Sequence, residues 1–411
     1  MHHPSFIKPR YDSGGFSSIP QMVKSLLTSD TKPLIPIEGI NSQYDIVVLF
    51  LIDGFGWRLF EKHQDGFPFL REVTEHGVVT KLVSQFPSTT AAQITCIHTG
   101  LPVGQNWVFE WQYYEPHLDA VITPLLFSYA GTTERDMLKS TGVDPRTLYP
   151  TKTLYQDLGR HGVTSFVFQH REYTPSTFSD IVFDGANIRP YKTFPEALVN
   201  MRNVLTHQTS PIYICLYFDK LDAISHDYGP NSPQIEAEID TLLTVLDRQF
   251  MKPFAGKQKK ALFILTADHG QIDVDPGTTV YLNRDPAFVG YERFLKTNQK
   301  GELLVPAGSC RDVFLYIRDG LLDEAQDFLS TRLAGKAEVH KVQTLIEQGY
   351  FGLPPVSPEF LARVGDLVIL PNKYESVWWY EKGKFEQKYY GHHGGLTPEE
   401  MEIPFLVYDM S

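Results

Sequence analysis

The chain has 411 residues, of which 42% are hydrophobic and 21% charged, and its formal net charge is −12 at pH 7. This is the composition of an ordinary globular chain, long enough for two or three domains. The acidic excess argues against a protein that binds nucleic acid or an anionic membrane through bulk charge, but it leaves a local cationic site such as a bound metal open. The three isolated cysteines fit neither a disulfide framework nor a CxxC zinc site.

No segment has the pattern of a targeting or membrane-spanning sequence. The first ten residues lack the apolar stretch of a secretory signal. The longest apolar runs have about seven residues, whereas a helix needs ~20 to span a bilayer. We therefore expect a soluble, cytoplasmic protein without a membrane span.

Strand and helix signals alternate after a leader of about 40 residues, rich in Ser, Pro and Gly, which we expect to pack on the surface. Residues 46–52 form a continuous apolar run, as expected of a parallel strand covered on both faces. Further elements are expected in chain order: a helix over 68–76, strands over 78–84, 164–169 and 212–218, a helix over 233–250, and strands over 261–266 and 405–408. This alternation predicts an α/β fold with an open, mostly parallel sheet flanked by helices.

The segment 275–390 has a different pattern. We expect a strand over 313–317, a helix over 321–333, and strands near 366–370 and 377–380. Because a core-type strand returns afterwards, we divide the chain into a core, residues 1–274 and 391–411, and a small α+β insertion, residues 275–390.

Acidic residues and histidines gather where the predicted strands end or begin. In chain order they are Asp53, Asp222, His226, Asp268, His269, His392 and His393. In an open parallel sheet, ligands bind outside the carboxyl ends of the strands, so these side chains should converge. Each alone is explained by a turn, a local hydrogen bond or a polar loop. Together they favour a metal site, because clustered carboxylates need a cation, and Asp and neutral His suit zinc and related ions.

A second candidate component is the segment 86–100, which we expect to form a short helix ended by Gly100, with Ser88, Thr89 and Thr90 in its first turn. A hydroxyl there lies at the positive end of the helix dipole, near free N–H groups that can hold an oxyanion. Ser and Thr are also ordinary N-caps. Beside two metal ions such a hydroxyl becomes a candidate nucleophile, because a metal can hold it as an alkoxide near neutral pH.

In order and spacing, these residues resemble the nucleotide pyrophosphatase/phosphodiesterase family of the alkaline phosphatase superfamily. The family pattern has a strand followed by Asp-Gly, a Thr that opens a helix ending in Thr-Gly-Leu-Pro, Asp-x-x-x-His-x-x-Gly-Pro, Asp-His-Gly and a late His-Gly. The matching segments are 53–54, Thr90 with 99–102, 222–230, 268–270 and 393–394. The resemblance implies an alkaline-phosphatase-like sandwich and metal-dependent hydrolysis of phosphodiester or pyrophosphate bonds.

The resemblance also implies the roles of the site residues. Two divalent ions, zinc or alternatively manganese, would be held by Asp222, His226 and His393 and by Asp53, Asp268 and His269, with Thr90 bridging toward the second. Thr90, ten positions before Gly100 as in the family, is the implied nucleophile that forms a phosphothreonine, and Thr89 is the second candidate. His393 is preferred to His392 because it directly precedes glycine. Gln93, one helical turn after Thr90, is expected to donate to a phosphate oxygen in place of an asparagine.

Other functions stay open at this point. One is a phosphomonoesterase, phosphonate hydrolase or phosphomutase on the same two-metal scaffold; another is a noncatalytic nucleotide-binding module. The expected partner is a small phosphodiester or nucleotide, and the sequence does not predict the oligomeric state. Four aromatic residues could either stack a base or pack in the core: Trp107, Trp111, Tyr113 and Tyr114.

Overall fold

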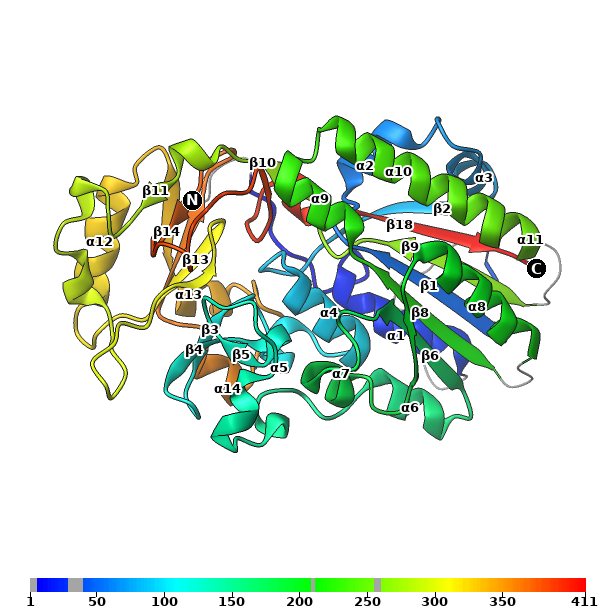
Figure 1. Cartoon of the computed structure of the whole chain (residues 1–411), viewed down its shortest axis with the longest axis horizontal. Helices are drawn as coiled ribbons and strands as arrows, with labels where there is room; N and C mark the ends of the chain where they lie inside the picture. The colour runs from blue at the N-terminus through cyan, green and yellow to red at the C-terminus, as the bar shows by residue number, and fades with distance from the viewer. Residues whose placement is uncertain (1–5, 29–39, 208–210, 255–259) are drawn as a thin grey trace.

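The computed structural model describes residues 6–28, 40–207, 211–254 and 260–411. Its centre is a seven-stranded sheet with the strand order β2-β18-β9-β1-β8-β6-β7 (Figure 1). The strands are β1 (Ile46–Ile52), β2 (Val78–Val83), β6 (Thr164–His170), β7 (Asn187–Tyr191), β8 (Ile212–Phe218), β9 (Ala261–Thr266) and β18 (Glu402–Asp409). Neighbours from β9 to β7 run parallel, and β18 runs antiparallel to both β2 and β9. The predicted α/β class with a mostly parallel central sheet is confirmed.

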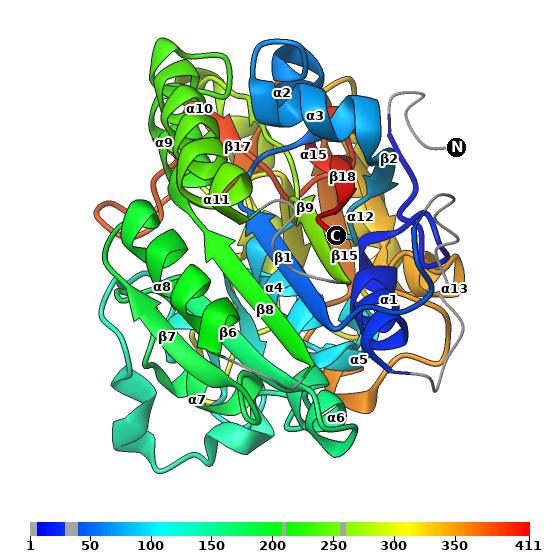
Figure 2. The same cartoon turned by 90° about the vertical axis from the view of Figure 1, so that its right-hand side faces the viewer.

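Helices cover both faces of this sheet (Figures 1 and 2). One layer contains α2 (Trp57–His63), α3 (Pro68–His76), α8 (Phe194–His207) and α10 (Pro233–Leu246), and the other contains α1 (Ile19–Leu27), α4 (Thr90–Thr99), α6 (Leu154–Arg160) and α7 (Thr177–Val182). Every residue of β1 is buried. Phe50 faces the first layer, where its ring contacts Phe194 of α8. No helix among the described residues is long and apolar enough to cross a membrane.

Local signals explain where several helices begin and end. Pro68 occupies the first turn of α3, which spans the expected residues. The Ser232 hydroxyl caps α10 by accepting from the Ile235 N–H. The expected helix over 233–250 ends as an α-helix at Leu246, because the chain continues as a π-helical turn over Asp247–Met251. Gly100 ends α4 with a φ of 75°, a left-handed conformation that glycine adopts without strain.

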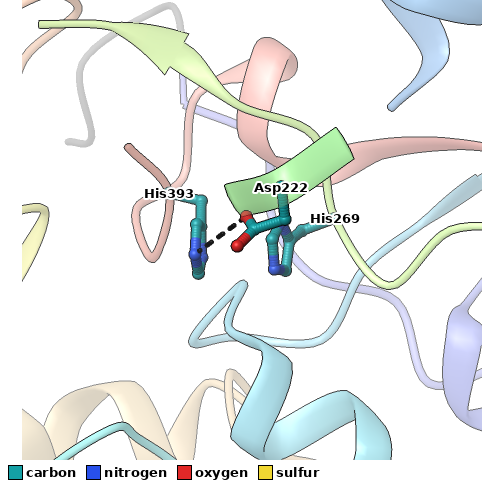
Figure 3. Close-up of side chains that lie close together, drawn as sticks. All are labelled: Asp222, His269 and His393. Atoms are coloured by element: carbon teal, nitrogen blue, oxygen red, sulfur yellow. Dashed lines mark ion pairs between the residues drawn. The ribbon is translucent and has the colours of Figure 1, made fainter. Parts of the chain in front are cut away.

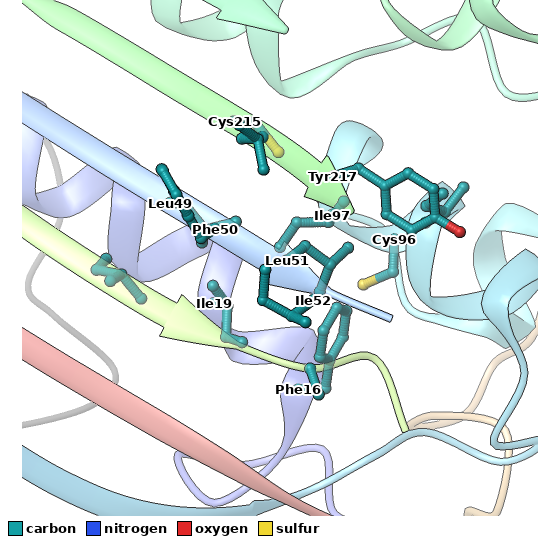
Figure 4. Close-up of a cluster of buried hydrophobic side chains, with 14 of the residues drawn as sticks. Phe16, Ile19, Leu49, Phe50, Leu51, Ile52, Cys96, Ile97, Cys215 and Tyr217 are labelled. Carbon is teal, nitrogen blue, oxygen red and sulfur yellow. The ribbon is translucent and has the colours of Figure 1, made fainter. Parts of the chain in front are cut away.

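The leader corrects one expectation. Phe16 and Ile19 are completely buried, and the apolar side of α1 packs on the sheet beside α4. Figure 4 shows Ile19 near Leu49 and Leu51 of β1. Residues 6–28 of the leader are therefore part of the main core and not a surface segment, because the apolar residues of α1 recur at helical spacing between the polar ones. Residues 1–5 and 29–39 of the leader lie outside the described residues.

A smaller four-stranded sheet lies at the other end of the molecule (Figure 1), in the order β12-β13-β15-β14. Its strands are β12 (Ala307–Ser309), β13 (Asp312–Leu315), β14 (Ala337–Lys341) and β15 (Leu367–Pro371), and α12 (Leu322–Arg332) packs on it. The residues expected as a strand near 377–380 form β16 (Val377–Trp378), which pairs with β11 (Val280–Tyr281).

The two faces of this small sheet belong to different cores. Val313 and Leu315 join a separate cluster with Leu329 of α12, whereas Phe314 between them joins the main core. This is the alternation expected of a strand covered on both faces. The small sheet is therefore joined to the rest of the molecule through packed side chains.

Candidate active site

The predicted ligands meet at the edge of the sheet where β9, β1 and β8, three adjacent strands, end. Asp53 directly follows β1, and its N–H donates to Phe218 O at the end of β8. Gly54 has a φ of 72°, and a Cβ there would lie 3.0 Å from the Asp222 backbone. The Asp-Gly turn thus lets the chain leave β1 close to α9 (Lys220–Tyr228), which carries Asp222 and His226 one turn apart. Asp268 lies just beyond β9.

One group of ligand-type atoms combines Asp53, Asp268 and His269, all buried, within 4.8 Å of one another. His269 Nε2 lies 3.4 Å from Asp53 Oδ1 and 3.3 Å from Asp268 Oδ2. Thr90 Oγ1 lies 3.2 Å from His269 Nε2 and 3.5 Å from Asp53 Oδ2. Thr90 therefore faces the group toward which the sequence analysis expects it to bridge.

A second group combines Asp222, His269 and His393 (Figure 3). Asp222 Oδ1 lies 3.6 Å from His393 Nε2, and the rings of His269 and His393 stack with centroids 3.6 Å apart. His226 lies beside this group, its Nε2 3.3 Å from Asp222 Oδ2 and its ring centroid 5.1 Å from that of His393. The structure thus brings all six Asp and His residues together, with His269 adjoining both groups.

Three of these histidines are oriented in the same way. Each places Nδ1 against a backbone carbonyl: His226 on Gly391 O at 2.8 Å, His269 on Gly270 O at 3.1 Å, and His393 on Ser88 O at 2.9 Å. A hydrogen bond donated from Nδ1 leaves the Nε2 lone pair for a metal, as is usual for metal-ligating histidines. His392 differs, because its Nδ1 lies 3.1 Å from both the N–H and the carbonyl oxygen of its neighbour His393.

The electrostatics of the site indicate a missing positive charge. The buried atoms Asp53 Oδ1 and Asp268 Oδ2 have no hydrogen-bond partner among the described residues. Burial, reinforced by the neighbouring carboxylates, raises the pKa of Asp53 well above its ordinary value, and burial raises the pKa of Asp268 to about 7. Burial lowers the pKa of His269 to about 4 and that of His393 to about 3, so both are neutral at pH 7. Close carboxylates with neutral imidazoles are a donor set suited to divalent ions.

Of the three hydroxyls expected in the first turn of α4, Thr90 alone contacts the acidic group. Thr89 is the N-cap, and its hydroxyl donates to Phe109 O at 3.0 Å. Ser88 precedes the helix, and its hydroxyl donates to Gly395 O at 2.8 Å. Ser88 thereby fixes the loop that carries His393. The expectation that Ser88 lies in the first turn of the helix is corrected.

Gln93 does not reach the site. Its side chain is completely buried, and its Oε1 accepts from Gln85 Nε2 at 2.8 Å. Its Nε2 donates to Gln85 O at 3.3 Å and to Pro87 O at 3.2 Å. Both amide hydrogens are thus engaged by the preceding loop, so the expected donation to a phosphate oxygen is corrected.

The four aromatic residues after the helix have separate surroundings. Tyr113 is completely buried, and the indole N–H of Trp107 donates to Leu148 O at 2.9 Å. Tyr114 donates its hydroxyl to Asp119 at 2.8 Å. Trp111 is 47% exposed, so it alone keeps a large free ring surface.

Comparison with known proteins identifies the family. The family model of type I phosphodiesterases / nucleotide pyrophosphatases matches residues 47–396, a span that contains every ligand-type residue described above. The chain belongs to this family. It is accordingly a hydrolase of phosphodiester or pyrophosphate bonds. No curated protein matches the sequence.

Solved structures of murine and human ectonucleotide pyrophosphatase / phosphodiesterase 5 share the fold. A murine structure is 17% identical with a TM-score of 0.63, and the match covers 88% of each chain. The inactive murine variant in complex with AMP is 16% identical with the same TM-score, over 88% of this chain and 87% of that one. The human protein is 15% identical with a TM-score of 0.61 over 88% and 87%.

Two further residues of this phosphodiesterase bind the carboxylates of Asp53 and Asp222 and were not expected from the sequence. The Tyr217 hydroxyl, from the end of β8, donates to Asp53 Oδ2. Gln271 Nε2 donates to the Asp222 carboxylate and to Asp222 O. Gln271 could have been found from its position directly after the Asp-His-Gly motif, whereas nothing distinguishes Tyr217 from the other apolar-strand residues.

Proposed function

We propose that this phosphodiesterase binds two divalent metal ions, zinc or manganese, and hydrolyses a small phosphodiester through Thr90. The carrying observation is that two buried carboxylate oxygens have no hydrogen-bond partner among the described residues, while the Nε2 atoms of three histidines each lie within 3.6 Å of an aspartate oxygen. One ion would be held by Asp53, Asp268 and His269 and the other by Asp222, His226 and His393. When bound, such ions polarise phosphoryl oxygens and lower the pKa of a coordinated hydroxyl.

The chain itself positions the nucleophile. Thr90 is the first residue of α4, and its Oγ1 faces the Asp53 carboxylate. The first N–H groups of a helix have no intrahelical partner, so the N-terminus of α4 can stabilise negative charge on the phosphoryl oxygens. Attack by Oγ1, which loses its hydroxyl proton, forms the bond from Thr90 to phosphorus and breaks the bond to the leaving group, which takes up a proton. Water then cleaves the phosphothreonine and restores the hydroxyl.

The charge of the site favours a diester over a monoester. Three carboxylates balance three of the four positive charges of two divalent ions, which leaves one charge. Among the described residues, the ion pairs of Asp53, Asp222 and Asp268 involve only histidines. One residual positive charge matches a phosphodiester, which carries one negative charge, whereas a phosphomonoester dianion would need a further cation.

Metal analysis and a matched pair of substrates test this proposal. The purified protein should contain close to two divalent ions per chain, and chelation should abolish hydrolysis that zinc or manganese then restores. Bis(p-nitrophenyl) phosphate should be cleaved with higher kcat/KM than p-nitrophenyl phosphate. Full activity without bound metal would overturn the two-metal proposal. A preference for the monoester would favour the phosphomonoesterase alternative, and nucleotide binding without turnover would favour a noncatalytic module.

A further inference from the structure

A partly exposed tyrosine borders the side of the site that contains His226. The side chain of Tyr389 is 39% exposed, yet its ring centroid lies only 5.0 Å from that of His226. The same ring lies 6.2 Å from that of His392 in an edge-on arrangement. Tyr389 therefore forms an aromatic wall beside the second group of ligands, with part of its surface open to solvent.

The backbone around this tyrosine is held in place. Gln387 is buried, and its side-chain amide both accepts from the Tyr389 N–H and donates to Tyr389 O, each at 3.1 Å. The Gln387 N–H in turn donates to the Tyr281 hydroxyl at 3.1 Å. The next residue, Tyr390, donates its N–H to His226 O at 2.8 Å. An exposed ring on an anchored backbone is preorganised to contact a ligand without a large loss of entropy.

The ring of Tyr389, and not its hydroxyl, is the part of the side chain suited to recognise a leaving group. The hydroxyl forms no hydrogen bond with the described residues, whereas the open part of the ring can stack on a planar group. A phosphate or pyrophosphate has no ring and gains nothing from this contact.

The position of Thr90 decides which part of the substrate meets this wall. In phosphoryl transfer the attacking and leaving oxygens lie roughly in line. Thr90 contacts His269 and Asp53, so the leaving group departs toward Asp222, His226 and His393. Tyr389 borders that side through its contact with His226.

We propose that Tyr389 is a specificity-determining residue that contacts the leaving group and selects an uncharged, planar alcohol over a phosphate or pyrophosphate. This inference rests on the proposed hydrolysis through Thr90. It narrows the substrate class from phosphodiester or pyrophosphate bonds to diesters of an aryl or similar flat alcohol.

Comparing two substrates that transfer the same thymidylyl group but have different leaving groups separates recognition of the leaving group from the chemical step. The p-nitrophenyl ester of thymidine 5′-monophosphate releases nitrophenol, and thymidine 5′-triphosphate releases pyrophosphate. With the metal-loaded enzyme, Tyr389→Ala should lower kcat/KM for the nitrophenyl ester about 3- to 10-fold, the range expected for an aromatic contact. It should leave kcat/KM for the triphosphate within about twofold of wild type. Tyr389→Phe should retain most of the activity on the ester, because the ring remains.

Tyr390→Ala is the matched control, because this neighbour is more exposed and meets His226 only through its backbone. This variant should leave kcat/KM unchanged for both substrates. All variants should keep the wild-type metal content and unfolding midpoint. Equal losses of Tyr389→Ala on both substrates, or a loss of metal, would overturn the proposal, because Tyr389 would then act through His226. Unchanged kinetics would overturn it too. A metal-loaded wild type that cleaves neither substrate would instead refute the proposed function, before any variant is compared.

Discussion

Buried acids are balanced differently in two regions of this molecule. Where the small sheet joins the core, Glu400 is completely buried and accepts from Arg311 Nε and Nη2 at 2.9 Å each. Glu115, also completely buried, accepts from Arg363 Nε at 2.6 Å. At the edge of the main sheet, by contrast, no arginine or lysine of the described chain pairs with Asp53.

The difference separates a structural charge from a functional one. An acid that meets an arginine inside the protein needs nothing from outside, whereas a buried carboxylate without such a partner needs a proton or a cation. Glu110 and Asp312 are an example of buried acids that are balanced by a proton. They lie against each other in the interior, and burial raises the pKa of Glu110 to about 8, so the pair holds a proton at pH 7. The Asp53 group differs because it includes the imidazole of His269, which is neutral at pH 7 and whose Nε2 faces both carboxylates.

The largest effect is expected at Thr90. Thr90→Ala should reduce kcat by about 10³-fold or more, because it removes the proposed nucleophile, while metal content stays at the wild-type value. Thr89→Ala is the control and should be much milder, because its hydroxyl donates to Phe109 O. Steady-state kinetics and metal analysis on both proteins test this. A larger loss for Thr89→Ala would show that the wrong threonine was chosen.

Removing one partner of a buried ion pair should destabilise the fold without a direct effect on catalysis. Glu400→Gln should lower the free energy of unfolding by about 3–5 kcal/mol, because Arg311 would stay buried without its counter-charge. The control Glu399→Gln breaks a partly exposed pair with Lys373 and should cost only about 0–1 kcal/mol. Urea unfolding of both variants measures the difference. Equal costs would remove the distinction between the two regions.

Removing the unpaired acid Asp268 should instead stabilise the metal-free protein at high pH. The folded-state pKa of Asp268 is raised to about 7, so its protonated form stabilises the fold, and that stability is lost as the pH rises through about 7. Asp268→Asn should abolish this loss and raise the free energy of unfolding at pH 9 by on the order of 1–3 kcal/mol. The same variant should bind about one ion fewer per chain. Unchanged stability and unchanged stoichiometry would show that Asp268 is an ordinary loop residue.

The smallest effect is expected at Gln93. Gln93→Ala should lower the free energy of unfolding by about 1–3 kcal/mol, because it leaves buried groups of Gln85 and Pro87 unpaired. Metal content and kcat/KM should stay near wild type. Parallel unfolding and kinetic measurements decide. A loss of kcat/KM with normal unfolding would restore its interpretation as a phosphate ligand.

Sequence patterns predicted the main sheet and the convergence of the acidic residues and histidines, because both depend on short-range signals. Continuous apolar runs located β1, β8 and β9 at their observed bounds, and the polar residues just beyond them do converge. What the patterns could not supply is the direction of side chains. Gln93 and Thr90 lie one turn apart on the same helix, yet one contacts the preceding loop and the other the acidic group. Tyr389 is equally hidden in the sequence, because only tertiary packing sets its ring beside His226.

The position of β18 determines when the central sheet can be completed during synthesis on the ribosome. This strand follows all the others in the sequence, yet it lies inside the sheet, paired on one side with β2 and on the other with β9. At about 5–20 residues per second, β9 waits on the order of ten seconds for its neighbour. During that interval a nascent chain exposes the unpaired backbone N–H and C=O groups of β2 and β9, a template for pairing with another nascent chain. We therefore expect closely spaced translating ribosomes to favour pairing between nascent chains of this protein.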